Sequence, residues 1–423
     1  MDQSTFPSSR RDFVKSQAMV AGSLLVGGLS RGAGSTPGRR SWKIAIHMDT
    51  SVPTLGLHGL HAAFWGLPDV EIVAIYDANS ENIEQRLAGS RAKRHYTSYV
   101  EMLEKERPDI VVLTTRLPNL HLEQIREAAK RGCHIYCEKP LCAFLEEADE
   151  IVQLAETHRI QIAMAHPCRH GLGFVTMKRL IAEGRIGKPL TVQGWGKSDH
   201  RGGGEDMMTL GTHIFDLMIH LFGAPETVTG DVRVEGSPFA GPLLNKTTED
   251  IGPAAGDEIF ATFRFAGGVR GIFESRKGLY DSKTNRMGVS VIGSQGMLSC
   301  RFSDMDAEPQ PLRFHNSPCA PADASVSEEI ALVEERVIPD AEDLVYNVPG
   351  MPRGPIFAEA GRFAAWDLMA AIEEGRPPVA NIQDARTALE MIHGVYASHL
   401  ANRTLTLPLE DRRHPLREFQ EGI

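Results

Sequence analysis

The sequence predicts an α/β protein in which a doubly wound parallel sheet is followed by an α+β domain with a large, mostly antiparallel open sheet. Three observations support this prediction. The length of 423 residues suits two domains better than one. Short apolar runs alternate with amphipathic stretches from Trp42 to about His166, and strand candidates in closer succession follow after that point.

The first half contains the regular alternation. Each short apolar run is typical of a buried strand and each amphipathic stretch of a helix, so we expect parallel strands joined by right-handed crossovers. The expected strands are 43–48, 70–76, 109–113, 134–137 and 161–165. The expected helices are 56–66, 80–88, 99–105, 120–131 and 144–157.

The second half is predicted to form the antiparallel sheet, with helices against one face. The expected strands are 190–196, 228–234, 258–265, 269–275, 288–292 and 297–302, and the expected helices are 174–183, one ending at 221, 356–374 and 384–401. Gly267 and Gly268 predict a hairpin turn between two of these strands. A proline-rich stretch over 307–355 predicts a surface insertion or long loop. We therefore expect one domain over 41–165 and a second over 166–423.

The first forty residues predict export. Arg10 and Arg11 precede an uncharged stretch, Ser16 to Ser30, that is too short and too rich in glycine to span a membrane stably. The arginine pair resembles the signal read by the twin-arginine translocase. We expect residues 1–40 to be a signal peptide and linker, and the protein to be periplasmic or otherwise extracytoplasmic. A disordered basic tail is the alternative, and membrane anchoring by an uncleaved signal is left open because no A-x-A cleavage motif stands out.

Charge and cysteine content exclude some classes of function. The net charge is −10 and no basic patch is visible, which argues against a nucleic-acid partner and favours a small or neutral ligand. The chain has six cysteines, and no second CxxC pair completes a zinc site. We expect the cysteines to be buried small apolar residues.

Asp77 closes the second expected strand. In a dinucleotide-binding fold an acid at this place accepts hydrogen bonds from the adenosine ribose hydroxyls, and it favours NAD over NADP because it repels the extra phosphate. A helix cap is the alternative interpretation of the same residue.

Two further segments carry more specific signals. Glu138-Lys139-Pro140 follows the strand over 134–137, at the edge where open parallel sheets bind ligands, and the lysine charge can orient a hydroxyl group and lower its pKa. Farther along, His213 and Asp216 are spaced i, i+3 on an expected helix. They therefore share a face and can offer a base together with an orienting carboxylate.

Together these segments resemble the Gfo/Idh/MocA family (glucose-fructose oxidoreductase, inositol dehydrogenase and rhizopine catabolism proteins). The resemblance implies a Rossmann domain, a substrate domain with an open sheet, and NAD(P)-dependent oxidoreductase activity on a hydroxyl of a sugar, glycoside or cyclitol. It implies homodimers or homotetramers formed through the open sheet. With export, it favours tightly bound NAD, with NADP the weaker alternative.

The resemblance also implies roles for individual residues. The expected catalytic residues are Lys139, His213 and Asp216. The expected cofactor-binding residues are Gly56, Gly59, Asp77, Pro118, Asn119, His121, Glu138, Lys139 and Pro140. The expected substrate-binding residues are His166, Arg169, Glu205, Asp206 and Thr209.

The chain departs from the family pattern at three places. The glycine-rich turn expected straight after the first strand is absent, and glycines return only at Gly56 and Gly59. The family's Thr-Pro after the next central strand is replaced by Arg116-Leu117. The acid that often stands four residues before the histidine is replaced by Thr209.

These departures keep two alternatives open. One is an NAD-assisted glycosidase or lyase, in which a sugar hydroxyl is oxidised transiently and the hydride returns after elimination. The other is a protein that binds sugar or metal without a dinucleotide. The candidate metal ligands would be His213, Asp216 and His220, with His166, His200, Glu205 and Asp206 nearby.

Overall fold

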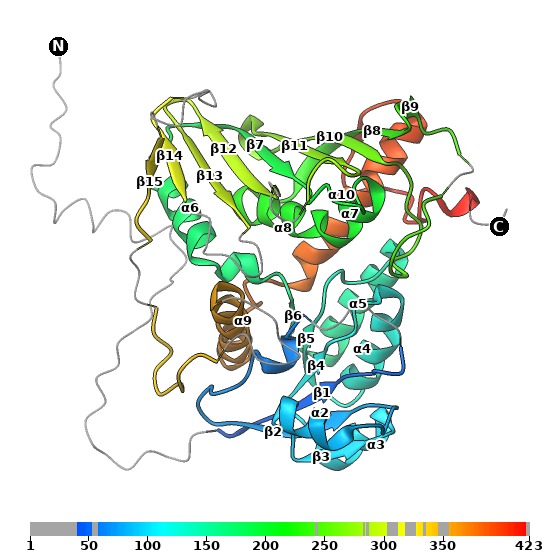
Figure 1. Cartoon of the computed structure of the whole chain (residues 1–423), viewed down its shortest axis with the longest axis vertical. Coiled ribbons are helices and arrows are strands. Elements are labelled where there is room, and N and C mark those ends of the chain that lie inside the picture. Colours follow the sequence, from blue (N-terminus) through cyan, green and yellow to red (C-terminus); the bar gives the residue numbers. More distant parts are fainter. Residues whose placement is uncertain are drawn as a thin grey trace, which may run out of the picture. The chain divides into compact units, whose positions relative to one another are not determined.

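The computed structural model describes residues 40–52, 58–241, 244–281, 284, 287–302, 312–317, 327–332, 336–345 and 355–419. The expected signal peptide lies outside these residues, apart from Arg40. From Ser41 onward the chain forms one compact unit, which contains two sheets (Figure 1). None of the helices in the described part of the chain combines the length and the apolar character needed to cross a bilayer.

The first sheet has six parallel strands in the order β3-β2-β1-β4-β5-β6. The strands are β1 (Trp42–His47), β2 (Val70–Tyr76), β3 (Arg94–Tyr96), β4 (Ile110–Leu113), β5 (His134–Cys137) and β6 (Ile162–Met164). This is the strand order of a Rossmann fold, and the doubly wound prediction is confirmed. The order reverses between β1 and β4, which creates a crevice at the carboxyl ends of these two strands.

Strand residues alternate between two buried faces of this sheet. The helices associated with it are α2 (Ile83–Ser90), α3 (Tyr99–Glu106), α4 (His121–Ala129) and α5 (Leu145–His158). Ala45, Val111 and Ile135 share one hydrophobic cluster with residues of α3, α4 and α5. Ile44 and Val112 belong to a different cluster, as the two-residue period of a strand requires.

The second face is covered in a way that the sequence did not predict. The helix expected over 56–66 is wrong in its described part, where only the 3-10 turn η1 (Leu60–Ala62) forms. Gly59 and Gly66 have φ values of 81° and 67°, and these left-handed conformations interrupt a helix at both ends. The long helix α9 (Pro355–Glu374), from the far end of the chain, completes the cover with Ala365 and Leu368.

The second sheet has ten strands and is mixed, although mostly antiparallel. Its main path runs β15-β14-β13-β12-β7-β11-β10-β8-β16, and β9 pairs with β8. The strands are β7 (Pro189–Trp195), β8 (Pro225–Val234), β9 (Ser237–Pro238), β10 (Glu258–Phe265), β11 (Arg270–Arg276), β12 (Gly288–Gly293), β13 (Met297–Arg301), β14 (Arg313–His315), β15 (Ser327–Glu329) and β16 (Leu405–Thr406). The β10–β11 hairpin is confirmed. Two details differ from expectation: β7 and β11 pair in parallel, and β14 and β15 lie within the stretch expected to be a loop.

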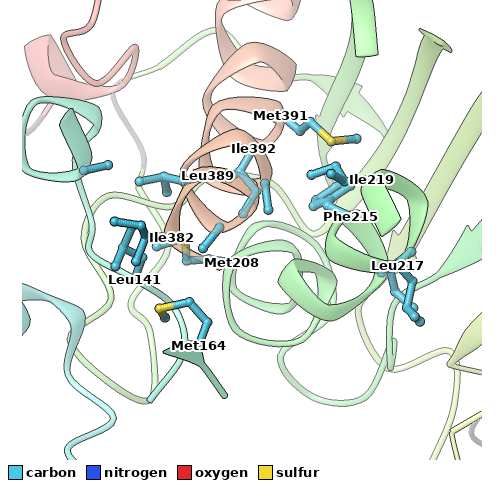
Figure 2. Close-up of a cluster of buried hydrophobic side chains, with 14 of the residues drawn as sticks. Leu141, Met164, Met208, Phe215, Leu217, Ile219, Ile382, Leu389, Met391 and Ile392 are labelled. Carbon is cyan, nitrogen blue, oxygen red and sulfur yellow. The ribbon is translucent and has the colours of Figure 1, made fainter. Parts of the chain in front are cut away.

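Helices α6 (Leu172–Ala182), α7 (Gly204–Thr209), α8 (Gly211–Phe222) and α10 (Ile382–Ala401) lie on one face of this sheet (Figure 1). Figure 2 shows part of the apolar core around α10: Leu389 lies on the side of this helix that faces Leu141, and Phe215 and Ile219 of α8 lie on its other side. Leu141 and Met164, which follow or belong to strands of the first sheet, are part of the same cluster. This shared core supports the residues described next.

Candidate active site

Lys139 links the two sheets. It stands just past β5, and its Nζ donates a hydrogen bond to the backbone carbonyl oxygen of Thr209 at 2.8 Å. Thr209 is the last residue of α7, four positions before His213. The ammonium group is therefore held beside the first turn of α8, as the pairing of the two motifs predicts.

His213 has the properties of a base. Burial lowers the pKa of its imidazole well below 6.5, and the charges of Lys139 and His166 lower it further. The ring is therefore neutral at neutral pH and can accept a proton. Its Nδ1 atom is buried and has no hydrogen-bond partner among the described residues. The rings of His166 and Phe302 lie edge-on to it, with centroids at 5.4 and 5.7 Å.

Behind His213 lies a buried ionic group. Asp216, one turn along α8, has Oδ1 at 3.1 Å from His166 Nδ1 and at 2.8 Å from Arg169 Nη2. Burial alone would raise the pKa of Asp216, but the Arg169 and His166 contacts lower it below its usual range. Asp216 thus remains a carboxylate, and it orients His166 rather than His213.

Arg169 is surrounded by acceptors from this chain. Its Nε donates to Asp216 Oδ2 at 2.8 Å, and Nη2 donates to the Asp216 carbonyl at 3.1 Å. Its Nη1 donates to Asp384 Oδ2 at 2.6 Å and to the Val379 carbonyl at 2.7 Å. Since these contacts use the guanidinium donors, the geometry favours a positioning role for Arg169 over the expected substrate contact.

The other expected substrate residues also have partners within the protein. Glu205 Oε1 accepts hydrogen bonds from both the backbone N–H, at 2.9 Å, and the hydroxyl of Thr248. Asp206 Oδ2 accepts from Ser275 Oγ at 2.5 Å and from the Ser198 N–H at 2.9 Å, in full burial. Thr209 Oγ1 donates to the Glu205 carbonyl at 2.8 Å. Asp206 in particular anchors a loop rather than facing a ligand.

Asp77 presents its carboxylate to a hydroxyl group. Thr50 Oγ1 donates to both Asp77 oxygens, at 3.1 and 2.9 Å, and Arg86 Nε lies 2.8 Å from Oδ2. A ribose hydroxyl would make the same kind of hydrogen bond. Asp77 therefore fits the adenosine end of a dinucleotide if the ribose replaces the Thr50 hydroxyl on its carboxylate. Asp77 Oδ1 also accepts from the Asn79 N–H at 2.9 Å, which is a turn in the loop before α2; the N-cap of that helix is Asn82, so Asp77 is not its cap.

The phosphate-binding turn is less typical of the fold. Gly56 lies outside the described residues, and Gly59 precedes the 3-10 turn η1 in a left-handed conformation. Residues 58–67 contain no α-helix whose N-terminus could face a pyrophosphate.

The residues after β4 form a structural turn. Pro118 begins the 3-10 turn η2 (Pro118–Leu120), and His121 is buried with a ring nitrogen 2.9 Å from each of the Leu141 and Thr115 carbonyl oxygens. His121 therefore joins this turn to the segment after β5. Asn119 donates from Nδ2 to Asp250 Oδ2 at 2.9 Å, across to the second sheet's part of the chain.

His58 is a site residue that the sequence reasoning missed. Its Nδ1 donates to Glu138 Oε2 at 2.9 Å, and burial lowers its pKa from 6.5 to about 4. Burial raises the pKa of Glu138, but His58 and Lys139 outweigh it and bring the value to about 2. Glu138 is thus an anion beside Lys139, next to the peptide bond to Pro140. The sequence offered one indication of this role, since His58 directly precedes Gly59, an expected cofactor-binding residue.

Arg116 and Glu249 are a second missed pair. Arg116 Nη2 lies 2.8 Å from Glu249 Oε2, and both side chains are largely buried. Arg116 was noted only as a departure from the family pattern. Its partner, 133 residues away, could not be read from local sequence.

The metal interpretation finds no support in the described part of the chain, where no group of three or more His, Cys, Asp or Glu side chains could hold an ion. His220 instead lies 3.4 Å from Lys178 Nζ, and the exposed His200 lies 3.8 Å from Asp199 Oδ1.

Comparison with known proteins agrees with this geometry. Residues 56–166 match the model of the oxidoreductase family with an NAD-binding Rossmann fold, and residues 174–299 match the GFO/IDH/MocA C-terminal domain. The scyllo-inositol 2-dehydrogenase (NAD(+)) of Bacillus subtilis is 25% identical over 63% of this chain and 80% of its own length. The myo-inositol 2-dehydrogenase of Thermotoga maritima is 24% identical over 55% of this chain and 68% of its own length.

Other matches are shorter or show the fold alone. Two uncharacterized oxidoreductases of Schizosaccharomyces pombe are 30% and 27% identical, and the matches span only 41% and 47% of their length. The structure of levoglucosan dehydrogenase with NADH and levoglucosan superposes with a TM-score of 0.66 at 19% identity, covering 88% of this chain and all of the other. With both domain models matched in order and the paired lysine and histidine motifs in contact, the chain belongs to the Gfo/Idh/MocA oxidoreductase family.

Proposed function

We propose that this protein is an NAD(P)-dependent oxidoreductase that acts on a hydroxyl group of a sugar, glycoside or cyclitol. The observation that carries the proposal is the placement of the Lys139 ammonium against Thr209, one turn before the neutral His213. The names of the inositol dehydrogenase relatives and of levoglucosan dehydrogenase support the substrate class.

The residues have complementary roles in this reaction. A bound nicotinamide supplies the hydride acceptor. His213 accepts the hydroxyl proton, because its neutral imidazole is the stable form at neutral pH. Lys139 holds a positive charge next to the substrate oxygen and stabilises the negative charge that develops there. Asp216 and Arg169 act behind them by orienting His166.

We propose NAD as the cofactor, held tightly, with NADP the weaker alternative. Asp77 supports NAD because its carboxylate already accepts from a hydroxyl group, that of Thr50. Arg86 partly balances this charge, which reduces the repulsion of a 2′-phosphate. Comparing the dissociation constants of NADH and NADPH tests this preference.

The experiment for the main proposal has two steps. The purified protein is first denatured, and the released small molecules are identified by ultraviolet spectrum and mass. The protein is then mixed with NAD⁺ or NADP⁺ and a panel of inositols, aldoses and anhydrosugars, and formation of the reduced nicotinamide is followed by absorbance. Sugar binding without any dinucleotide, bound or added, would favour the dinucleotide-free alternative instead.

A second candidate function is a glycosidase or lyase that oxidises its substrate transiently. The observation in its favour is the pair of imidazoles, His166 and His213, with ring centroids 5.4 Å apart. Elimination next to a transient carbonyl needs a second base, and His166 backed by Asp216 could supply it. A chromogenic glycoside that releases its leaving group without net NADH formation would select this candidate.

We propose further that the protein is exported by the twin-arginine route and works as a homodimer or homotetramer. Arg10 and Arg11 support export, and that route carries folded proteins, so a tightly bound cofactor could be loaded beforehand. The face of the ten-stranded sheet opposite α8 and α10 supports self-association, since it carries the exposed Phe260.

A further inference from the structure

The carboxyl ends of β1 and β4 hold an unusual set of charges. Open α/β sheets bind ligands at this crevice, and dinucleotide-binding members place the pyrophosphate on a helix N-terminus after β1. Residues 58–67 contain no such helix. The end of the neighbouring strand carries a positive charge instead: Arg116 follows β4, and its side chain is largely buried.

Arg116 starts from the same edge of the sheet as the reacting groups. It follows β4 closely, Lys139 follows β5, and these two strands are parallel neighbours. At this edge His58 donates to Glu138 at 2.9 Å, next to Lys139. The Arg116 guanidinium therefore comes from the edge of the sheet at which open α/β folds bind a dinucleotide.

The anion on Arg116 comes from a segment between β9 and β10. Glu249 Oε2 lies 2.8 Å from Arg116 Nη2. Its neighbours hold it there: Thr248 donates to Glu205, Asp250 accepts from Asn119 at 2.9 Å, and Ile251 is buried. The segment therefore places the Glu249 carboxylate at the crevice, and its residues on both sides of Glu249 are fixed to the rest of the protein.

We propose that Arg116 binds the diphosphate of the dinucleotide, and that Glu249 occupies the guanidinium as an internal substitute for that anion until the cofactor displaces it. This inference rests on the proposed function, which brings a dinucleotide to the site. Carboxylates and phosphates both match the planar fork of arginine donors. The diphosphate carries more negative charge than one carboxylate, so exchange is favourable, but the cofactor must compete with Glu249 for its site.

The competition predicts opposite effects for the two partners. Glu249→Gln keeps the side-chain shape and removes the carboxylate charge that competes with the diphosphate for Arg116, so it should tighten NADH binding about tenfold. Arg116→Gln removes the cation and should weaken NADH binding by about tenfold or more. Asp231→Asn is the matched control: it removes one carboxylate from a half-exposed pair with Arg233 on β8, outside the segment from Thr247 to Ile251, and its NADH affinity should stay near that of the unmodified protein. Affinity is measured by NADH fluorescence titration.

Fragments of the cofactor show whether the Glu249→Gln effect comes from the charge at Arg116 or from a more open crevice. The Glu249→Gln gain should appear for NADH and for ADP-ribose, which contains the diphosphate, and should be absent for adenosine. An equal gain for adenosine would mean that the substitution merely opens the crevice, and this would overturn the inference.

A measurement on the unmodified protein keeps the inference testable even if a variant fails to fold. Displacing Glu249 should loosen its segment, so the amides of Thr247 to Ile251 should exchange hydrogen faster when NADH is bound, whereas ordinary ligand burial slows exchange. Unchanged or slower exchange would contradict the proposal. If the unmodified protein binds no dinucleotide, the proposed function itself fails. If it binds NADH but Glu249→Gln binds equally well, only this inference fails.

Discussion

The Nζ atom of Lys139 lies 2.8 Å from the backbone carbonyl oxygen of Thr209, so a residue at the edge of the six-stranded sheet is anchored directly to the helix before His213. The family often places an acidic side chain at the position of Thr209. In this chain a main-chain oxygen accepts from the lysine instead. This hydrogen bond positions the ammonium group, whose charge lowers the pKa of His213.

Removing either reacting group should lower turnover with little effect on folding. Lys139→Ala and His213→Ala should each reduce kcat about 10²- to 10⁴-fold, the usual contribution of a positioned acid or base. His220→Ala is the matched control, since His220 lies on the same helix but contacts Lys178, and it should retain activity. Turnover, melting temperature and bound cofactor are measured on the same samples. A destabilised His213→Ala with near-normal activity per folded molecule would refute the catalytic assignment.

The pH dependence should reveal the depressed pKa of His213. The pKa lies well below 6.5 because burial, Lys139 and His166 disfavour the charged ring. Oxidation requires the neutral base, so kcat/KM should stay level as the pH falls through 6.5 and decline only well below it. An acid limb centred at 6.5 or above would contradict the assignment.

Acid unfolding must be separated from this titration. Burial lowers the pKa of His47 and His170 from 6.5 to about 4. Below pH 6.5 the unfolded chain therefore binds protons that the folded chain does not, and the free energy of unfolding falls as the pH decreases. Circular dichroism at each pH identifies the range in which the fold is intact and the kinetic limb can be interpreted.

The elements that the sequence predicted best are those whose signal is local. The ranges of β2, β5 and β10 match because each is an apolar or alternating run with clear ends. The helix expected over 56–66 does not form in its described part, because Gly59 and Gly66 adopt left-handed conformations there, and α9, some three hundred residues later in the chain, shares the burial of its apolar residues. Strands β14 and β15 were missed because they depend on pairing partners more than on local pattern.

The same division applies to the site. Lys139 and His213 could be predicted as reacting groups because each stands in a compact motif whose chemistry is recognisable from the sequence. The role of Asp206 could not be found, because its partner Ser275 lies 69 residues away and makes it a buried anchor. The partners of the Arg116–Glu249 pair are even farther apart, at 133 residues, so the sequence could not predict their contact for the same reason.

Removing the charge of Asp216 from its buried pair with Arg169 should mainly lower the free energy of unfolding. Asp216→Asn leaves the buried Arg169 without its main counter-ion, and such a loss costs about 3–5 kcal/mol of unfolding free energy. Asp411→Asn is the control, because its pair with Arg413 is 62% and 69% exposed and is screened by solvent, so its loss should change stability little. Denaturant unfolding of the three proteins gives the comparison. Equal stability of Asp216→Asn and the unmodified protein would show that Arg169 does not depend on this carboxylate.

Export should depend on the arginine pair. Arg10→Lys combined with Arg11→Lys keeps the charge of the N-terminal region and should leave the protein inside the cell, because the translocase reads arginine rather than charge. Cell fractionation followed by detection of the protein measures the effect, and an Arg39→Lys, Arg40→Lys variant is the control with the same number of changes outside the signal. Unchanged export of the first variant would show that another signal operates.

Self-association should depend on the face of the ten-stranded sheet that is turned away from α8. Phe260, Glu274 and Trp195 stand in register across β10, β11 and β7, and Phe260 is 38% exposed. Phe260→Glu would place a second carboxylate directly beside Glu274 in this row, and an interface would have to bury the two like charges together, so the substitution should dissociate a dimer or tetramer. Leu400→Glu is the matched control, since Leu400 is 39% exposed at the end of α10, away from this row. Light scattering during size-exclusion chromatography gives the mass of each species. A monomeric unmodified protein would refute self-association, and a Phe260→Glu variant that keeps its full assembly would show that the interface lies elsewhere.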